Sequence, residues 1–264
     1  MSDAKSAGEE FARLGEILAV LRGDNGCPWD REQDEKSLLS FLLEEAYEAV
    51  EAVQSGRAAS VREELGDLLL EIVFLARVYE EKGAFRLSEV VKGINDKMIA
   101  RHPHVFGSER RESSREVLGV WNRRKQEEKK HASLLDGVSK SQPALAAAFQ
   151  AGQRASAAGF DWPTTQGALE KLREETGELD RALESGSREA VVHEIGDLLL
   201  AAANVSRKAG VNPELALLQA NGRFRDRFAH LERRLKDEGR EFASATPGEL
   251  DALWEEAKSR KPGR

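Results

Sequence analysis

The sequence has little cysteine, few aromatic residues and no long apolar run. Cys27 is its single cysteine, so no disulfide can form within the chain and no cysteine-based metal site can be built. We therefore expect a reducing, cytoplasmic setting. Apolar stretches fall far short of the roughly 18–20 residues that a membrane-spanning helix needs. Residues 1–10 are polar and acidic, so we expect no signal peptide and no membrane partner.

The chain also lacks an excess of positive charge. Its formal net charge is −7, although 33% of its residues are charged. General nucleic-acid-binding proteins usually carry a basic surface, so we expect no direct nucleic-acid binding. An anionic small molecule is compatible with this balance, because a bound metal and a few local cations can hold a phosphate.

What the chain does contain is an internal repeat with an offset of 130 residues. Residues 40–77 align with residues 170–207, and each copy reads Glu-Glu-x-x-Glu, fifteen residues, then Glu-x-x-Asp. Flanking matches, with small shifts, join 26–30 to 159–163, 95–101 to 221–227, and 121–125 to 254–258. We therefore predict two domains, 1–135 and 136–264, with the boundary between Lys130 and Pro143.

Helical periodicity extends over most of both copies, whereas strand patterns are nearly absent. Apolar residues recur every three or four positions over 11–21, 38–53 and 65–75. Gly56 and Gly186 are expected to end helices, and Ser60-x-x-Glu63 predicts a capping box at the start of the next helix in the first copy. We predict an all-α fold in which Glu-Glu-x-x-Glu and Glu-x-x-Asp lie on two antiparallel helices.

Five acidic residues recur at matching positions, while their acidic neighbours do not. Glu51, Glu63 and Glu71 face Arg181, His193 and Ala201 in the second copy. The recurring acids are Glu44, Glu45, Glu48, Glu64 and Asp67, matched by Glu174, Glu175, Glu178, Glu194 and Asp197. Glutamate-rich helices are most often just solvated, and either motif alone indicates no more than that. Recurrence at identical spacing favours a function beyond solubility.

The spacing of these acids suits a metal site. Residues three and four apart share a helix face, so antiparallel packing gathers both motifs into one cluster. Like charges repel there unless a cation offsets them. A set of oxygen ligands without histidine or cysteine suits Mg²⁺, with Mn²⁺ as a second choice, and Mg²⁺ commonly shares its coordination with substrate phosphates.

A cationic block follows the acidic motifs in each copy. Lys97 and Arg101 lie one helical turn apart, as do Arg223 and Arg227. Such pairs can bind phosphate oxygens and stabilise a leaving pyrophosphate. Trp121 and Lys125, matched by Trp254 and Lys258, offer an aromatic face and a charge one turn apart. Taken alone, each charged pair could equally form a salt bridge on a helix surface, and each tryptophan could equally be a packing residue.

Taken together, these motifs resemble the MazG family. The resemblance covers nearly the whole chain in the two-repeat form. It rests on the two acidic motifs and on Gly26-Cys27-Pro28-Trp29-Asp30, Arg101-His102-Pro103-His104-Val105-Phe106 and Gly159-Phe160-Asp161-Trp162. It implies an all-α nucleoside triphosphate pyrophosphohydrolase that uses magnesium. It also implies a homodimer in which the helices of each domain form four-helix bundles around the site.

The resemblance further implies roles for single residues. In the second copy the magnesium ligands would be Glu175, Glu178, Glu194 and Asp197, and the nucleotide contacts Lys171, Arg223, Arg227, Trp254 and Lys258. In the first copy the ligands would be Glu45, Glu48, Glu64 and Asp67, and the nucleotide contacts Lys97, Arg101, Trp121 and Lys125. The catalytic carboxylates that position water would be Glu174 and Glu175, with Glu44 and Glu45 as counterparts.

One departure from the family pattern concerns the cationic block. In two-repeat members of the family, catalysis is usually assigned to the second copy. In this chain, however, the second copy has Arg223 where the family pattern has lysine. Arginine preserves the charge but not the geometry, whereas Lys97 keeps the lysine. We expect two magnesium-competent sites with catalysis mainly in the second.

Three functions are compatible with the sequence. The leading one is hydrolysis of nucleoside triphosphates between the α and β phosphates by water attack on the α phosphorus, a nucleotide-pool house-cleaning reaction. A narrower substrate such as dUTP, dCTP or phosphoribosyl-ATP would suit the same fold. A non-catalytic nucleotide-binding regulator is the third, although such a protein need not keep five acids in both copies.

Overall fold

A computed structural model describes residues 2–108, 110, 117 and 133–259. These residues form helices and connecting turns without any strand, which confirms the all-α prediction. The chain divides into two compact units, residues 1–121 and 122–264, and each is treated on its own. The finer boundary between Lys130 and Pro143 stays a prediction. None of the described helices has both the length and the apolar character that crossing a membrane requires.

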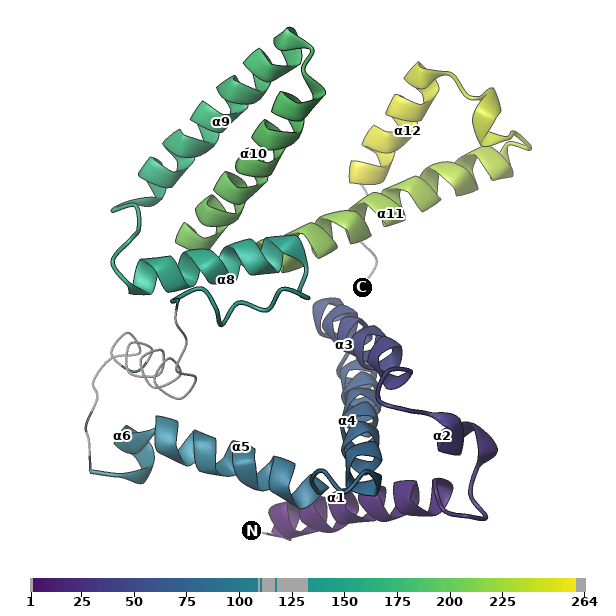
Figure 1. Ribbon diagram of the computed structural model, residues 1–264. Coiled ribbons are helices and arrows are strands. Elements are labelled where there is room, and N and C mark those ends of the chain that lie inside the picture. The colour runs from purple at the N-terminus through teal and green to yellow at the C-terminus, as the bar shows by residue number, and fades with distance from the viewer. Residues whose placement is uncertain (1, 109, 111–116, 118–132, 260–264) are drawn as a thin grey trace. The chain divides into compact units, whose positions relative to one another are not determined.

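Unit 1 is built around an antiparallel helix hairpin, α3 and α4 (Figure 1). Helices α1 and α5 both pack against α4. The helices are α1 (Ser2–Leu21), α2 (Pro28–Glu32), α3 (Leu38–Ser55), α4 (Ala58–Glu81), α5 (Leu87–Arg101) and α6 (Pro103–Phe106). Prolines begin α2 and α6, because a proline in the first turn loses no helical hydrogen bond.

The core of unit 1 lies toward the end of the hairpin that is remote from its turn. The fully buried cluster joins Leu18 of α1, Leu38 of α3, and Val73, Phe74 and Val78 of α4. The acidic motifs lie between this core and the turn. Consequently, the half of the hairpin that carries the acids adds only the small buried side chains of Ala49 and Ala52 to the core of its unit.

The turn between α3 and α4 explains one wrong expectation. Gly56 ends α3 as predicted, with φ of 70° in the left-handed region that suits glycine. α4 then begins at Ala58, so Ser60 lies in its first turn and the predicted capping box is wrong. The left-handed turn leaves only Arg57 before the next helix begins. In the second copy, Ser187 occupies the corresponding position, and its side chain caps the helix by accepting from the Ala190 amide.

Unit 2 repeats the hairpin as α9 and α10 (Figure 1). Helix α8 packs against α10 and α11, and α11 packs against α12. The elements are α8 (Ala144–Ala157), α9 (Thr165–Ser185), α10 (Arg188–Lys208), α11 (Pro213–Asp237), a 3₁₀ helix η1 (Phe242–Ser244) and α12 (Pro247–Ser259). His230 and Arg234 of α11 both contact Glu256, which fastens α12 to α11.

In each unit a charged anchor fixes the loop before the first acidic helix. The Asp161 carboxylate accepts hydrogen bonds from Arg207 and Lys208 at the end of α10, and from Ser156 of α8. Arg207 is the main reason that the pKa of Asp161 lies far below its usual range. In unit 1, Arg22 binds Glu81 of α4 and the backbone carbonyls of residues 30 and 33. These anchors hold in place the loops that lead into α3 and α9.

Candidate metal centre and nucleotide site

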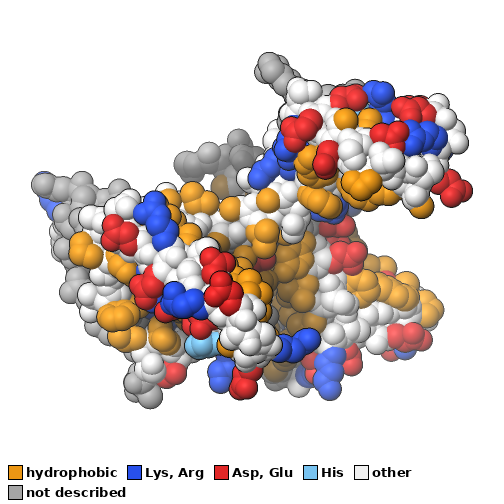
Figure 2. All heavy atoms as spheres, turned by 90° about the horizontal axis from the view of Figure 1, so that it is seen from above, with side chains coloured by type: hydrophobic (Ala, Val, Ile, Leu, Met, Phe, Trp, Pro, Cys, Tyr) orange, Lys and Arg blue, Asp and Glu red, His pale blue; other side chains and the backbone are white. Residues whose placement is uncertain are grey.

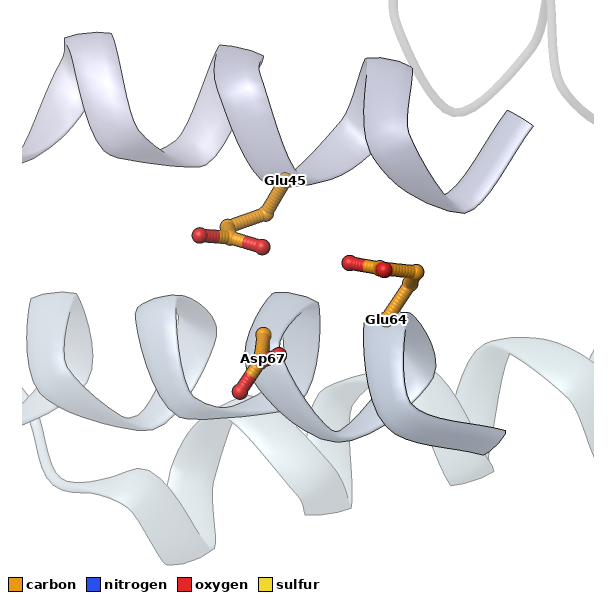
Figure 3. A group of neighbouring side chains, drawn as sticks. All are labelled: Glu45, Glu64 and Asp67. Atoms are coloured by element: carbon orange, nitrogen blue, oxygen red, sulfur yellow. The ribbon is translucent and has the colours of Figure 1, made fainter. Parts of the chain in front are cut away.

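The structure brings three of the predicted acids together in each unit. In unit 1 they are Glu45 of α3 with Glu64 and Asp67 of α4. In unit 2 they are Glu175 of α9 with Glu194 and Asp197 of α10. Within each group, one carboxylate oxygen from every residue lies within 4.8 Å of the others. Figure 3 shows Glu45 and Glu64 reaching from opposite helices into the space between them, with Asp67 beside them on α4. Their oxygens are close enough for a single cation to contact all three residues.

The register of the hairpin places these acids. Glu45 and Glu48 are one turn apart on α3, as Glu64 and Asp67 are on α4. Because the helices are antiparallel, Glu48 comes level with Glu64, and Glu45 comes level with Asp67. The negative charge of Glu48 acts on Glu64 and helps to raise its pKa, which agrees with this register. Glu48 lies at the edge of the three-residue group, and its counterpart Glu178 instead contacts Arg181 at 3.3 Å.

Burial and mutual repulsion both disfavour the charged carboxylates of the unit 1 cluster. Burial and then the neighbouring carboxylates raise the pKa of Glu45, of Glu64 and of Glu71. One oxygen of Glu45 and one of Glu71 are buried without a hydrogen-bond partner among the described residues. Oxygen donors that repel one another and lack partners fit a hard divalent cation such as Mg²⁺ or Mn²⁺. The residues present therefore suit the metal that the sequence predicted.

Unit 2 carries an internal cation beside its cluster. The Lys171 ammonium lies 2.8 Å from the Glu175 carboxylate and 2.7 Å from that of Glu174. These contacts raise the pKa of Lys171. Glu175 is only 5% exposed, whereas Glu174 and its counterpart Glu44 are exposed to solvent. The sequence assigned Lys171 to the nucleotide, and the structure places it against two of the predicted carboxylates.

The cationic block of unit 2 comes together only in part. The Arg227 guanidinium lies over the ring of Trp254, 5.7 Å from its centroid. Arg223 is exposed on α11, and Lys258 pairs with Glu255 on α12. No ion pair or hydrogen bond within the described part of unit 2 joins these residues to the acidic cluster. Their contact with a nucleotide stays a prediction.

In unit 1 the corresponding residues are less completely described. Lys97 is exposed on α5, and Arg101 at the end of α5 is buried. Trp121 and Lys125 lie outside the described residues. The nucleotide contacts proposed for this copy therefore rest on the sequence alone.

Sequence reasoning missed two features of the clusters. His193 lies 3.4 Å from Asp197, although its position was read only as one where an acid had been lost. Glu71 was likewise noted only as an acid without a counterpart, yet it lies close enough to Glu45 for the two charges to interact. The signal for Glu71 was its position four residues after Asp67, on the same face of the helix.

The fold and the clusters define the class: an all-helical protein with two copies of an acid-lined helix hairpin. Residues 33–106 and 164–230 match the MazG nucleotide pyrophosphohydrolase domain. The chain is 39% identical to the nucleoside triphosphate pyrophosphohydrolase/pyrophosphatase MazG of Thermotoga maritima, over 96% of this chain and 98% of that protein. It is 37% identical to the nucleoside triphosphate pyrophosphohydrolase of Escherichia coli K12, over 94% and 97% of the two chains. The chain belongs to the MazG family.

Proposed function

We propose that this protein hydrolyses nucleoside triphosphates, ribo or deoxy, to the nucleoside monophosphate and pyrophosphate. The observation that carries this proposal is the three-carboxylate group that recurs in both hairpins. The names of the Thermotoga and Escherichia relatives describe the same reaction in those proteins. The intracellular nucleotide pool is the proposed setting, which agrees with the single cysteine.

The carboxylates supply the metal site in this proposal. Glu175, Glu194 and Asp197 would hold Mg²⁺ in unit 2 with help from Glu178, and Glu45, Glu64 and Asp67 would do so in unit 1 with help from Glu48. A bound ion supplies Lewis-acid stabilisation of phosphate charge and lowers the pKa of bound water. Glu174 is exposed directly beside Glu175, so its carboxylate can accept a hydrogen bond from the attacking water and hold it in place.

The cations of unit 2 supply the nucleotide contacts. Lys171 lies beside the cluster, so phosphate oxygens bound there come within reach of its ammonium. Arg227 and Trp254 form a cation–aromatic pair that offers a guanidinium to a phosphate and a ring face to a base. Arg223 and Lys258 add positive charge on the same two helices, α11 and α12.

Product analysis tests the reaction. Purified protein is incubated with Mg²⁺ and each common ribo- and deoxynucleoside triphosphate, and the products are separated by ion-exchange chromatography. We expect monophosphate and pyrophosphate, and we expect a chelator to stop the reaction until Mg²⁺ or Mn²⁺ is restored. Formation of diphosphate and phosphate, or no turnover with any substrate, would refute the proposal.

We also propose that the protein is a homodimer. Both hairpins carry exposed apolar side chains, and such side chains gather in patches on the surface (Figure 2). They include Leu39, Leu43, Leu65 and Leu69 in unit 1, and Leu183, Val192, Ile195 and Leu199 in unit 2. A hairpin with an apolar outer face needs a second layer, and the same hairpin of a second chain completes a four-helix bundle.

Charge introduced on this apolar face should separate the dimer. Ile195 and Leu199 are one turn apart on α10 and are 43% and 50% exposed. The double variant I195K/L199K places two ammonium groups in the proposed interface, which is unfavourable to bury. Light scattering should give twice the 29.2 kDa chain mass for the wild type and a lower mass for the variant. V211K, which alters an exposed residue in the loop before α11, should leave the mass unchanged. A monomeric wild type would refute the dimer.

A further inference from the structure

The two acidic clusters differ in the layer of the hairpin next to them. In unit 1 this layer contains Phe41, four residues before Glu45, and Glu71, four residues after Asp67. The offset of 130 makes Lys171 and Ala201 their counterparts in unit 2. Residues four apart share a helix face, and the hairpins are antiparallel, so each pair is level across its hairpin. The layer therefore carries one negative charge in unit 1 and one positive charge in unit 2.

Unit 2 neutralises part of its own cluster. Lys171 binds Glu175, the most buried of its acids, at 2.8 Å. Ala201 is 6% exposed and adds no charge to the layer. In unit 1, by contrast, Phe41 packs against the hydrophobic core and touches the ring of Trp29, so it brings neither a donor nor a charge to Glu45.

Glu71 is not an ordinary solvated acid. One of its carboxylate oxygens is buried without a hydrogen-bond partner in the described part of the chain, and so is one oxygen of Glu45. The charges of Glu45 and Asp67 act on Glu71 directly. A buried carboxylate oxygen that gains no hydrogen bond is costly, and a cation is the partner that would satisfy both residues at once.

We infer that Glu71 is a further carboxylate of the unit 1 metal site, and that unit 1 binds a divalent cation without nucleotide, more tightly than unit 2. The inference rests on the proposed metal site and adds a residue and an order of binding to it. Unit 1 takes up its cation directly, because no ion pair within the described part of this unit involves Glu45, Glu64 or Asp67. In unit 2 the cation competes with Lys171 for Glu175, and phosphates that draw Lys171 away favour its entry.

Manganese titration of the full chain without nucleotide tests this inference. Free Mn²⁺ is followed by electron paramagnetic resonance, and we expect two classes of site. Glu71→Gln should weaken the tighter class by about 10- to 100-fold, the range typical of losing a supporting ligand at a metal site. Lys171→Met should strengthen the weaker class. Glu51→Gln removes the same charge from an exposed position on α3, opposite Arg181 in the repeat, and should change neither class.

Thermal unfolding gives a second readout. Without metal, Glu71→Gln should raise the melting temperature, because it removes a buried repulsive charge, and it should reduce the stabilisation that added Mn²⁺ provides. An unchanged tighter class in Glu71→Gln, or an equal change in Glu51→Gln, would overturn the inference. Equal affinity of the two units would overturn it as well. Monophosphate and pyrophosphate production by the wild type would still support the proposed function in those cases.

Discussion

Glu175→Gln should reduce nucleoside triphosphate turnover by about 10²- to 10³-fold, the range seen when one charge-stabilising group of an active site is removed. Glu175 is 5% exposed, belongs to the three-carboxylate group of unit 2 and binds Lys171. Glutamine keeps the shape but removes the charge that would hold a cation. Steady-state rates at saturating Mg²⁺ measure the effect, and circular dichroism checks that the variant folds.

The same substitution in unit 1 identifies the active half. Glu45→Gln should lower turnover much less than Glu175→Gln, because we place catalysis mainly in unit 2. Lys171 supports this assignment: it puts a cation beside the unit 2 cluster, where the counterpart in unit 1 is Phe41. Glu184→Gln, an exposed acid on α9, is the matched control and should leave the rate unchanged. Full activity in both Glu175→Gln and Glu45→Gln would show that the metal-site assignment is wrong.

Asp161→Asn should cost unit 2 about 3 kcal/mol of unfolding free energy, because removing one partner of this part-buried ion pair leaves the Arg207 charge without its main partner. The Arg207 side chain is 8% exposed, and its charge is paired with the Asp161 carboxylate. The same carboxylate also binds Lys208. Urea denaturation followed by hydrogen exchange in α9 and α10 isolates the effect on this unit. Ser156→Ala removes a single hydrogen bond to the same carboxylate and should cost about 1 kcal/mol. Equal losses in the two variants would contradict this account.

The stabilisation by Asp161 should also depend on pH. Arg207, the nearest cation, holds the pKa of Asp161 well below its usual range, so the folded state favours the ionised form. The contribution is therefore fully present above the ordinary pKa of about 4 and is lost as the pH falls through the lowered folded value. The stability difference between wild type and Asp161→Asn should narrow on acidification. If the unfolding free energies of wild type and Asp161→Asn changed with pH in the same way, the charge of Asp161 would not be what stabilises the loop.

Local patterns predicted the helices and much of the site. The helical period, the glycine that ends α3 and the prolines that begin helices act within a few residues, so they can be read from sequence. The acidic cluster was also predictable, because its members lie three apart on two helices that a short turn must pair. The capping box predicted at Ser60 was wrong, because α4 begins at Ala58, directly after the left-handed turn at Gly56.

Features that depend on tertiary packing were not predictable. In the sequence, Glu71 is simply an acid without a counterpart in the second copy. Only the structure shows that one of its carboxylate oxygens is buried. The position of Arg227 over the ring of Trp254 depends on how α12 folds back onto α11. Such contacts join positions whose partners a residue pattern does not specify. The pairing of Lys171 with Glu175 is different, because these residues are four apart on α9 and their spacing alone would have indicated it.

Hydrolysis in ¹⁸O-labelled water tests the central claim most directly. Mass spectrometry of the products shows which phosphorus the water attacks. We predict one labelled oxygen in the nucleoside monophosphate and none in the pyrophosphate, because water attacks the α phosphorus at the carboxylate cluster. Label in the pyrophosphate, or labelled phosphate released together with a nucleoside diphosphate, would contradict the account.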